Sequence, residues 1–435
     1  MIKKEVSPLE KILDAINYSS DNLFLTGKAG TGKTTFLKHL SENCNKRFIV
    51  TAPTGVSAIN LGGVTLHSFF KLPLQPYVPK VGLTGQFLDA LSAYNIRGER
   101  LEVIQKLELL VIDEVSMVRA DVLDAVSDVL CHYRKNPKPF GGVQVLLVGD
   151  LLQLPPVYKK EDEEILVGSY SSMFFFASKA LKLSGIRMIE FEKVYRQKDP
   201  VFTGFLNEIR QGYISSMGEA LLNKMLLSKF DNEDIITLCS HRAMARDIND
   251  SKLDSIMSSV NEYNATLSGE FSLNALPCES TLLLKIGARV LFTVNDTDGN
   301  RYYNGSIGTV LHLDKTSVTV RLDMSGEDIV VYPYVWRNMT FVVNPDTGNI
   351  EGKEVGTCKQ FPLALAWAIT IHKCQGLTFD RISVDAAKSF APGQVYVALS
   401  RCRTSDGIRL VSPITKKQLF VNREIESFYS QLRCS

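Results

Sequence analysis

Residues 23–34 read LFLTGKAGTGKT, an apolar run followed by a glycine-rich loop and the start of a helix. Glycines let such a loop turn so tightly that successive backbone N–H groups point at one anion, and the dipole of a helix that begins at Lys33 adds positive potential. Lys33 would neutralise the β- and γ-phosphates of a nucleotide, and the Thr34 hydroxyl would bind Mg²⁺. A chance match is the alternative, which the apolar run before the loop and the helical spacing after it oppose. The predicted nucleotide-binding residues here are Gly27, Ala29, Gly30, Thr31, Gly32, Lys33, Thr34 and Thr35.

Composition limits the classes of protein that the chain can belong to. It has 435 residues, 45% of them apolar, which suggests about three domains with ample core. The formal net charge is only +2, so a nucleic-acid site would have to be a local basic channel. The eight cysteines are scattered without CxxC or zinc spacing, which predicts reduced thiols.

The sequence also bears on location. Charged residues at 3–5 are not followed by an apolar run and a small-residue cleavage site, so we expect no signal peptide. The longest apolar segment, residues 361–371, is interrupted by Pro362 and is too short to cross a bilayer. We therefore expect a cytoplasmic protein with no membrane partner, or a nuclear or mitochondrial protein in a eukaryote.

Residues 1–150 alternate between β-like and helical patterns. This alternation predicts an α/β fold with a parallel sheet, helices on both faces and ligands at the carboxyl ends of the strands. Residues 71–100 break the rhythm with Pro73, Pro76 and Pro79 and are predicted to be an insertion. The expected strands are 23–26, 48–50, 109–112 and 143–148.

Two adjacent carboxylates follow the apolar run 109–112. Asp113 would bind Mg²⁺, and Glu114 would act as the base that aligns an attacking water. The alternative is an ordinary pair of acids at a helix start, which the helix dipole favours. Beyond the strand at 143–148, Gln153 could sense the γ-phosphate, although a single loop glutamine is more often only solvated.

A second polar region lies between these motifs. Residues 51–55, TAPTG, end a strand and begin a helix, and residues 65–70 read TLHSFF. Hydroxyls and N–H groups at a helix start suit a nucleic-acid phosphate, and an aromatic pair can stack on a base. For Phe69 and Phe70, packing in the core is the alternative. The pattern predicts nucleic-acid contacts by Pro53, Thr54, Gly55, His67, Ser68 and Phe69.

Taken in order, the motifs resemble those of one family. They are GKAGTGKT (27–34), TAPTGVSA (51–58), GGVTLHSFF (62–70), VIDEVSMV (111–118), PFGGVQVLLVGDLLQLPPV (139–157), VYRQ (194–197), ITIHKCQGLTFD (369–380) and QVYVALSRCRT (394–404). This order resembles the petite-integration-frequency (Pif) DNA helicases of superfamily 1B, relatives of RecD. The resemblance covers nearly the whole chain.

The second half of the chain again alternates strand and helix but has no phosphate loop. It would supply cations to a nucleotide held by the first domain. Arg196 and Arg401 are the candidates, since a guanidinium can stabilise charge on phosphate oxygens, whereas a surface salt bridge is the alternative for either. The resemblance places both arginines at the cleft, with Tyr195 against the adenine. Its motifs add Gln375 and Gly376 to the predicted ATP-binding residues.

Between residues 278 and 343 the pattern becomes β-rich, with turn clusters between antiparallel strands. The resemblance implies a small Src-homology-type β-barrel that lies against DNA. Just beyond it, Thr370, His372 and Lys373 would contact the DNA backbone, although His372, expected on a helix, could equally be a core histidine. The implied domains are a first RecA-like domain at 1–175 with a wedge-like insertion at 71–100, a second at 176–265 and 357–435, and the barrel at 266–356.

The motifs together predict a Mg²⁺- and ATP-dependent DNA helicase. The resemblance alone implies five-prime to three-prime movement on single-stranded DNA, forked or G-quadruplex substrates, roles in replication, repair or recombination, and a monomeric active unit. An ATP-controlled DNA-binding switch and an RNA helicase are the alternatives. Related helicases read adenine with a glutamine, and here Glu10 has that spacing. A carboxylate can accept from adenine N6 but cannot donate to N7, so we expect ATP to be preferred over GTP with looser adenine binding.

Overall fold

The structure is a computed structural model that describes residues 8–78, 96–230, 235–271, 276–296, 299 and 301–434. Its first sheet is parallel throughout and has the strand order β3-β2-β4-β5-β1-β6. The expected parallel arrangement is therefore confirmed. The strands are β1 (Leu23–Gly27), β2 (Phe48–Ala52), β3 (Val64–Thr65), β4 (Leu109–Ile112), β5 (Gln144–Val148) and β6 (Arg187–Phe191).

Alternate side chains of β1 enter different cores on the two faces of this sheet. Leu23 and Leu25 pack with apolar residues of α1 and α2, whereas Phe24 packs with those of α7 on the other face. This alternation follows from the two-residue period of a strand. The helices of this part are α1 (Pro8–Tyr18), α2 (Lys33–Asn43), α3 (Gly55–Asn60), α4 (Leu66–Phe70), α6 (Glu99–Lys106), α7 (Ala120–Arg134), α8 (Lys160–Leu166) and α9 (Lys179–Ser184).

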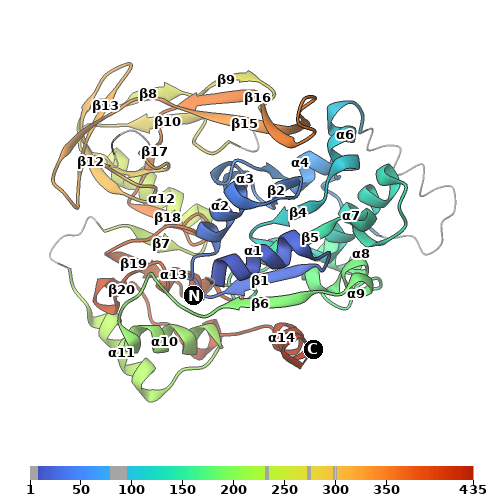
Figure 1. The fold of residues 1–435 in the computed structure, drawn as a ribbon. Coiled ribbons are helices and arrows are strands. Elements are labelled where there is room, and N and C mark those ends of the chain that lie inside the picture. Colours follow the sequence, from blue (N-terminus) through green and yellow to red (C-terminus); the bar gives the residue numbers. More distant parts are fainter. Residues whose placement is uncertain are drawn as a thin grey trace, which may run out of the picture.

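A second parallel sheet, of order β18-β7-β19-β20, lies beside the first (Figure 1). Its strands are β7 (Thr237–Cys239), β18 (Ala368–Thr370), β19 (Ile382–Asp385) and β20 (Ile408–Leu410). Apolar residues of α10 (Pro200–Arg210), α11 (Ser216–Leu227) and α13 (Gln394–Leu399) form one core with this sheet, and α12 (Arg242–Asp254) packs beside β7 and β18. The last helix, α14 (Arg423–Cys434), packs instead into the core of the first sheet.

The rest of the described chain is antiparallel. One sheet has the order β14-β13-β12-β11-β17, and β10-β8 and β15-β16-β9 are paired beside it. The β-rich pattern of the sequence is therefore confirmed, whereas its classification as a barrel stays a prediction. The strands are β8 (Asn261–Asn264), β9 (Thr266–Gly269), β10 (Thr281–Leu284), β11 (Arg289–Phe292), β12 (Ile307–Leu313), β13 (Val318–Leu322), β14 (Asp328–Val331), β15 (Tyr334–Val343), β16 (Ile350–Gln360) and β17 (Leu363–Leu365).

One sequence prediction about the fold is wrong, and another lies mostly outside the described residues. His372 was expected on a helix, but it lies in a turn that follows β18, so that prediction is wrong. The residues before it pair with β7 as a parallel strand, which the β-branched Ile369 and Thr370 suit. Most of the predicted insertion at 71–100 falls on 79–95, outside the described residues.

Candidate functional site

The glycine-rich loop joins β1 to α2, as the sequence predicts. Gly30 and Gly32 have φ values of 77° and 92°, which residues with a Cβ atom rarely adopt. Gly30 has a second constraint, because a Cβ atom there would lie 2.5 Å from the Cβ atom of Arg196. The backbone N–H of Tyr195 also donates to the Gly30 carbonyl at 2.8 Å. The loop is thus packed directly against the residues 195–196.

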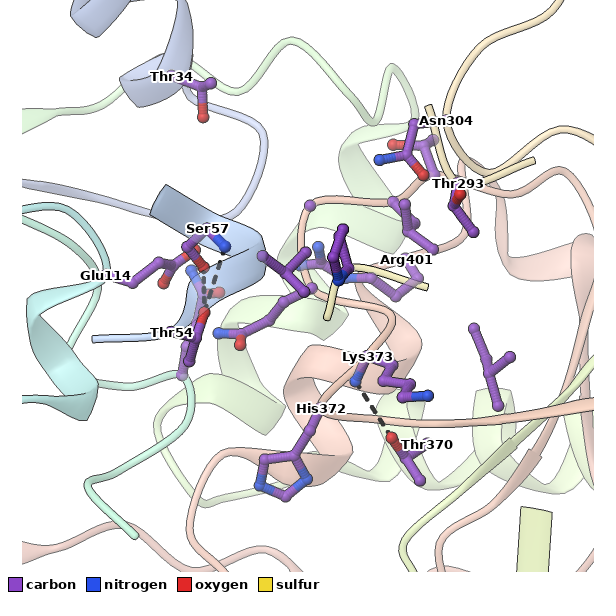
Figure 2. A pocket seen from close by; sticks show the side chains of 18 of the residues that line it. Thr34, Thr54, Ser57, Glu114, Thr293, Asn304, Thr370, His372, Lys373 and Arg401 are labelled. Atoms are coloured by element: carbon purple, nitrogen blue, oxygen red, sulfur yellow. Dashed lines mark hydrogen bonds between the residues drawn. The ribbon is translucent and has the colours of Figure 1, made fainter. Parts of the chain in front are cut away.

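Lys33 begins α2 and points back into the loop. Its Nζ donates to the carbonyl oxygens of Gly27 at 2.6 Å and Lys28 at 3.0 Å. Burial lowers the pKa of Lys33, and the negative charges of Asp150 and Glu114 oppose that shift. The next residue, Thr34, is exposed in the cleft (Figure 2).

The two acids expected beside the nucleotide follow β4. The backbone N–H of Asp113 donates to the Thr51 carbonyl at 2.9 Å, and Glu114 has a positive φ of 50°. Burial and the charge of Glu114 raise the pKa of Asp113 to about 7. Burial also raises the pKa of Glu114. The Thr34 hydroxyl and the Asp113 carboxylate are oxygen donors of the kind that Mg²⁺ prefers alongside water and substrate phosphates, so this donor set fits Mg²⁺.

Behind these acids lies an ion pair that the sequence did not reveal. The buried Asp150 carboxylate accepts from the Arg210 guanidinium at 2.8 and 3.3 Å and from Gln153 Nε2 at 3.2 Å. Although burial opposes ionisation, the charge and hydrogen bonds of Arg210 lower the pKa of Asp150. The side-chain amide of Gln153 therefore contacts Asp150, and Gln153 also lines the cleft.

Arg196 and Arg401, which come from distant parts of the sequence, both line the cleft. Arg401 is only 2% exposed and donates to the Val397 carbonyl and the Ser400 hydroxyl, each at 2.9 Å. Arg196 donates to the Ser400 carbonyl at 3.2 Å. Burial and the neighbouring Arg401 charge lower the pKa of Arg196 to about 9. Among the residues that the structure describes, no carboxylate lies within salt-bridge distance of either guanidinium.

A tyrosine of α13 joins the second sheet to the phosphate loop. The backbone N–H of Ala29 donates to the buried Tyr396 hydroxyl at 3.0 Å. A neighbouring glycine shows how closely the parts meet: a Cβ atom on Gly393 would lie 2.1 Å from the Gln153 carbonyl oxygen. The sequence motif 394–404 gave no sign of these contacts, because both depend on how the two sheets meet.

The predicted nucleic-acid residues fall into two groups. Thr54 caps α3, where its Oγ1 accepts from the Ser57 N–H at 3.3 Å, and it lines the cleft together with Pro53, Gly55 and His67. Phe69, in contrast, is only 1% exposed. The prediction that it stacks on a base is therefore wrong.

Phe69 is buried because its ring packs against two others. It makes edge contacts with Phe70 at 5.0 Å and with Phe341 of β15 at 6.1 Å. Ser68 is exposed but is not among the described residues that line the cleft. The core alternative for the aromatic pair is thus the correct one.

Thr370, His372 and Lys373 line the same cleft, on the side of the second sheet. The Lys373 N–H donates to Thr370 Oγ1 at 3.2 Å, and Lys373 Nζ pairs with Glu279 at 3.3 Å. Figure 2 shows these residues and Arg401 on one side of the cleft, facing Thr54, Ser57 and Glu114 on the other. The cleft encloses about 3620 Å³.

The last predicted nucleotide contacts differ in their placement. Gln375 and Gly376 line the cleft, as does Tyr195, a residue that is 64% exposed. Glu10 is exposed on α1, and among the described residues of this helix the cleft lining includes Leu9 and not Glu10. The role of Glu10 at the adenine stays a prediction. In the described part of the chain, no helix has both the length and the apolar character needed to span a membrane.

A phosphate loop at the end of a central parallel strand, with two acids at the end of another, identifies the protein as a P-loop nucleoside triphosphatase. Residues 3–220 match the model of the PIF1-like helicase family. The ATP-dependent DNA helicase Pif1 of Bdellovibrio bacteriovorus is 30% identical over 434 residues, which cover 98% of this chain and 92% of that protein. The chain belongs to the PIF1-like helicase family.

Further relatives agree with this assignment. Human ATP-dependent DNA helicase PIF1 is 32% identical, and the match covers 95% of this chain and 61% of the human protein. The crystal structure of Bacteroides sp Pif1 in complex with ADP-AlF4 is 42% identical with a TM-score of 0.89, covering 100% of this chain and 98% of that one. Bacteroides Pif1 bound to ssDNA, also 42% identical, has a TM-score of 0.70 and covers 99% and 97%.

Proposed function

We propose that the protein is a DNA helicase that hydrolyses ATP in this cleft. The observation that carries the proposal is the pair of guanidiniums, Arg196 and Arg401, held without a carboxylate partner among the described residues beside a phosphate loop. Both guanidiniums contact Ser400, and the charge of Arg401 lowers the pKa of Arg196. A bound nucleotide phosphate would offset the repulsion between these two like charges. The names of the relatives, ATP-dependent DNA helicases, support the same activity.

In the proposed reaction, a water oxygen attacks the γ-phosphorus while the Glu114 carboxylate takes the water proton. The bond from the γ-phosphorus to the bridging oxygen breaks, and ADP and inorganic phosphate result. Lys33 and the two guanidiniums stabilise negative charge on the phosphate oxygens. Mg²⁺, held by Thr34 and Asp113, would supply further positive charge at the β- and γ-phosphates.

Hydrolysis can drive movement because the nucleotide contacts both sheets. Lys33 begins α2, which packs on the first sheet, and Arg401 follows α13, which packs on the second. ATP would therefore favour the arrangement in which both side chains reach its γ-phosphate. A ligand shifts a conformational equilibrium only by its difference in affinity for the two states, and the γ-phosphate supplies that difference. Its loss on hydrolysis would let the two sheets separate.

We propose that single-stranded DNA crosses the same cleft, between Thr54 and His67 on one side and Thr370, His372 and Lys373 on the other. Five-prime to three-prime movement, forked or G-quadruplex substrates and a monomeric active unit belong to this proposal. Structures of related Pif1 proteins include one bound to ssDNA and one that concerns DNA unwinding at forked dsDNA, which supports a DNA substrate. The division into RecA-like domains and a small barrel is proposed with it.

One experiment tests the function directly. ATPase rates are measured with and without single-stranded DNA, beside unwinding of duplexes that carry a five-prime or a three-prime tail. We expect strong stimulation by DNA and unwinding of the five-prime-tailed duplex. Stimulation without unwinding of either duplex would instead identify an ATP-controlled switch, and preference for RNA would identify an RNA helicase.

A further inference from the structure

An exposed aromatic ring lies in the cleft at a place that no sequence motif predicted. Phe390 is 59% exposed, although large apolar side chains are usually buried, and its residue lines the cleft. The His241 ring lies 5.0 Å from it at an interplanar angle of 50°, and the His372 ring lies 6.3 Å away and is nearly parallel at 20°. Residues from three separate segments thus bring their rings together at the cleft.

The loop that carries Phe390 is held by hydrogen bonds from its backbone to a buried side chain. Oε1 of Gln394, a fully buried side chain at the start of α13, accepts from the backbone N–H of Phe390 at 2.9 Å and of Ala391 at 3.3 Å. Gly393, with φ of 76°, packs against the Gln153 carbonyl in a space that a Cβ atom would fill. The ring is therefore exposed on an ordered support, which lowers the entropic cost of binding a flat ligand.

The side chains around the Phe390 ring suit a nucleotide chain, because some of them are cationic and one of the flanking rings is neutral. Arg242 and Lys373 directly follow the two histidines in sequence, and both line the cleft. Burial, and then the charge of Arg242, lowers the pKa of His372, which favours a neutral ring at pH 7. A base needs an uncharged flat face, whereas its neighbouring phosphates need cations.

We propose that Phe390, flanked by His241 and His372, is a stacking platform for one base of the single-stranded DNA. This inference rests on the proposed function and adds a base contact to it. Every nucleobase has a π face, so such a platform grips DNA without selecting a sequence, as movement along a strand requires. It also replaces the role that the sequence assigned to Phe69, which the structure buries.

The platform is attached to the nucleotide site through α13. Gln394 holds the Phe390 loop, and two residues later the Tyr396 hydroxyl accepts from the Ala29 N–H of the phosphate loop. A shift of α13 relative to the phosphate loop would therefore move the platform as well. This places one base contact on the helix that also touches the ATP-binding loop.

The test compares binding of two oligonucleotides of equal length by fluorescence anisotropy, oligo-dT and a strand of abasic residues. We expect Phe390→Ala to weaken oligo-dT binding by about 5- to 150-fold, the range of one lost stack, and to leave abasic-strand binding within about twofold of wild type. Phe390→Trp should keep the wild-type affinity for oligo-dT. Tyr213→Ala, which removes a ring that is 53% exposed outside the cleft lining, should change neither affinity.

The contrary outcomes are distinct. Equal binding of oligo-dT by wild type and Phe390→Ala, or an equal loss for both strands, would overturn the platform but not the helicase. A raised KM for ATP with unchanged oligo-dT affinity would assign the ring to the nucleotide and also overturn it. A wild-type protein that binds no single-stranded DNA would overturn the proposed function itself. If Phe390→Ala loses its fold by circular dichroism, Phe390→Leu, which keeps the volume without the π face, answers the same question.

Discussion

At the scale of the residue, Lys33 carries a charge, and its ammonium group donates hydrogen bonds to the Gly27 and Lys28 carbonyls of its own loop. We expect Lys33→Ala to abolish ATP hydrolysis while the protein stays folded and binds single-stranded DNA, because the change removes a phosphate contact and not a core contact. ATPase assays, circular dichroism and anisotropy check the three parts. Lys106→Ala, a change at a half-buried lysine that pairs with Glu102 outside the cleft lining, is the matched control. Loss of the fold in Lys33→Ala would contradict this view of the side chain.

Glu114 is expected to be the base that accepts the proton of the attacking water. Glu114→Gln keeps the shape of the side chain but not its proton affinity, so turnover should fall by roughly 10²-fold or more while ATP still binds. Single-turnover hydrolysis and nucleotide binding, measured separately, check this. The exposed Glu102→Gln serves as the control. Turnover within a few-fold of wild type in Glu114→Gln would rule out Glu114 as the base.

Arg401 is expected to act on the charge of the transition state more than on the bound nucleotide. Arg401→Ala should lower kcat by about 10³-fold or more, which is the usual contribution of such an arginine to kcat, with a smaller change in nucleotide Kd. Arg401→Lys should recover little, because an ammonium cannot reproduce the two hydrogen bonds that fix this guanidinium. A variant that loses only DNA affinity would place Arg401 in the strand channel instead.

At the scale of the element, α7 carries a half-buried carboxylate, that of Asp128. Burial raises the pKa of Asp128 to about 6, although it accepts a hydrogen bond from the Tyr77 hydroxyl at 2.5 Å. Because the folded pKa lies above the unfolded value near 4, the protonated form is favoured in the fold. Stability is therefore lost as pH rises from about 4 to about 6, because the carboxyl ionises in the unfolded chain while it stays protonated in the fold.

We expect Asp128→Asn, which keeps an acceptor for Tyr77, to raise the free energy of unfolding by about 2 kcal/mol at pH 7.5 and by less at pH 5. Urea unfolding at both pH values measures this difference. The exposed Asp14→Asn on α1 should show no such dependence. A gain of equal size at the two pH values would mean that the benefit does not come from ionisation of Asp128.

At the scale of the whole molecule, the last helix of the chain completes the core of the first sheet. The Tyr429 hydroxyl lies 3.0 Å from Thr26 Oγ1 in β1, and the Phe428 ring stacks on Phe176 at 4.6 Å. In Figure 1, α14 lies away from the second sheet, although β20 of that sheet is the last strand before it in the sequence. A boundary drawn along the sequence therefore cannot separate the two sheets completely.

This contact predicts a long-range effect on stability. Phe428→Ala should destabilise the first sheet by about 2–4 kcal/mol, as large-to-small changes in a core do. Hydrogen exchange of the β1 amides, compared with those of β19, would show the loss, whereas Tyr332→Ala at an exposed ring should leave β1 unchanged. If β1 exchange is unaffected in Phe428→Ala, α14 is a surface attachment and not part of the core.

The sequence by itself determined the features whose physics is local. The phosphate loop, the helix start at Lys33 and the adjacent acids after β4 follow from spacing and glycine content, because backbone geometry over a few residues depends on those residues. The parallel and antiparallel regions also follow, since they depend on the period of apolar residues along each segment.

Only the tertiary structure decided which side chains are buried and which residues from distant segments contact one another. The sequence could not show that Phe69 is buried against Phe341 and Phe390 is exposed, since the same aromatic residue suits either place. Nor could it show that Asp150 pairs with Arg210 or that Tyr396 reaches Ala29. Burial and pairing depend on which distant surfaces come together, and that is a property of the packed molecule and not of any one segment.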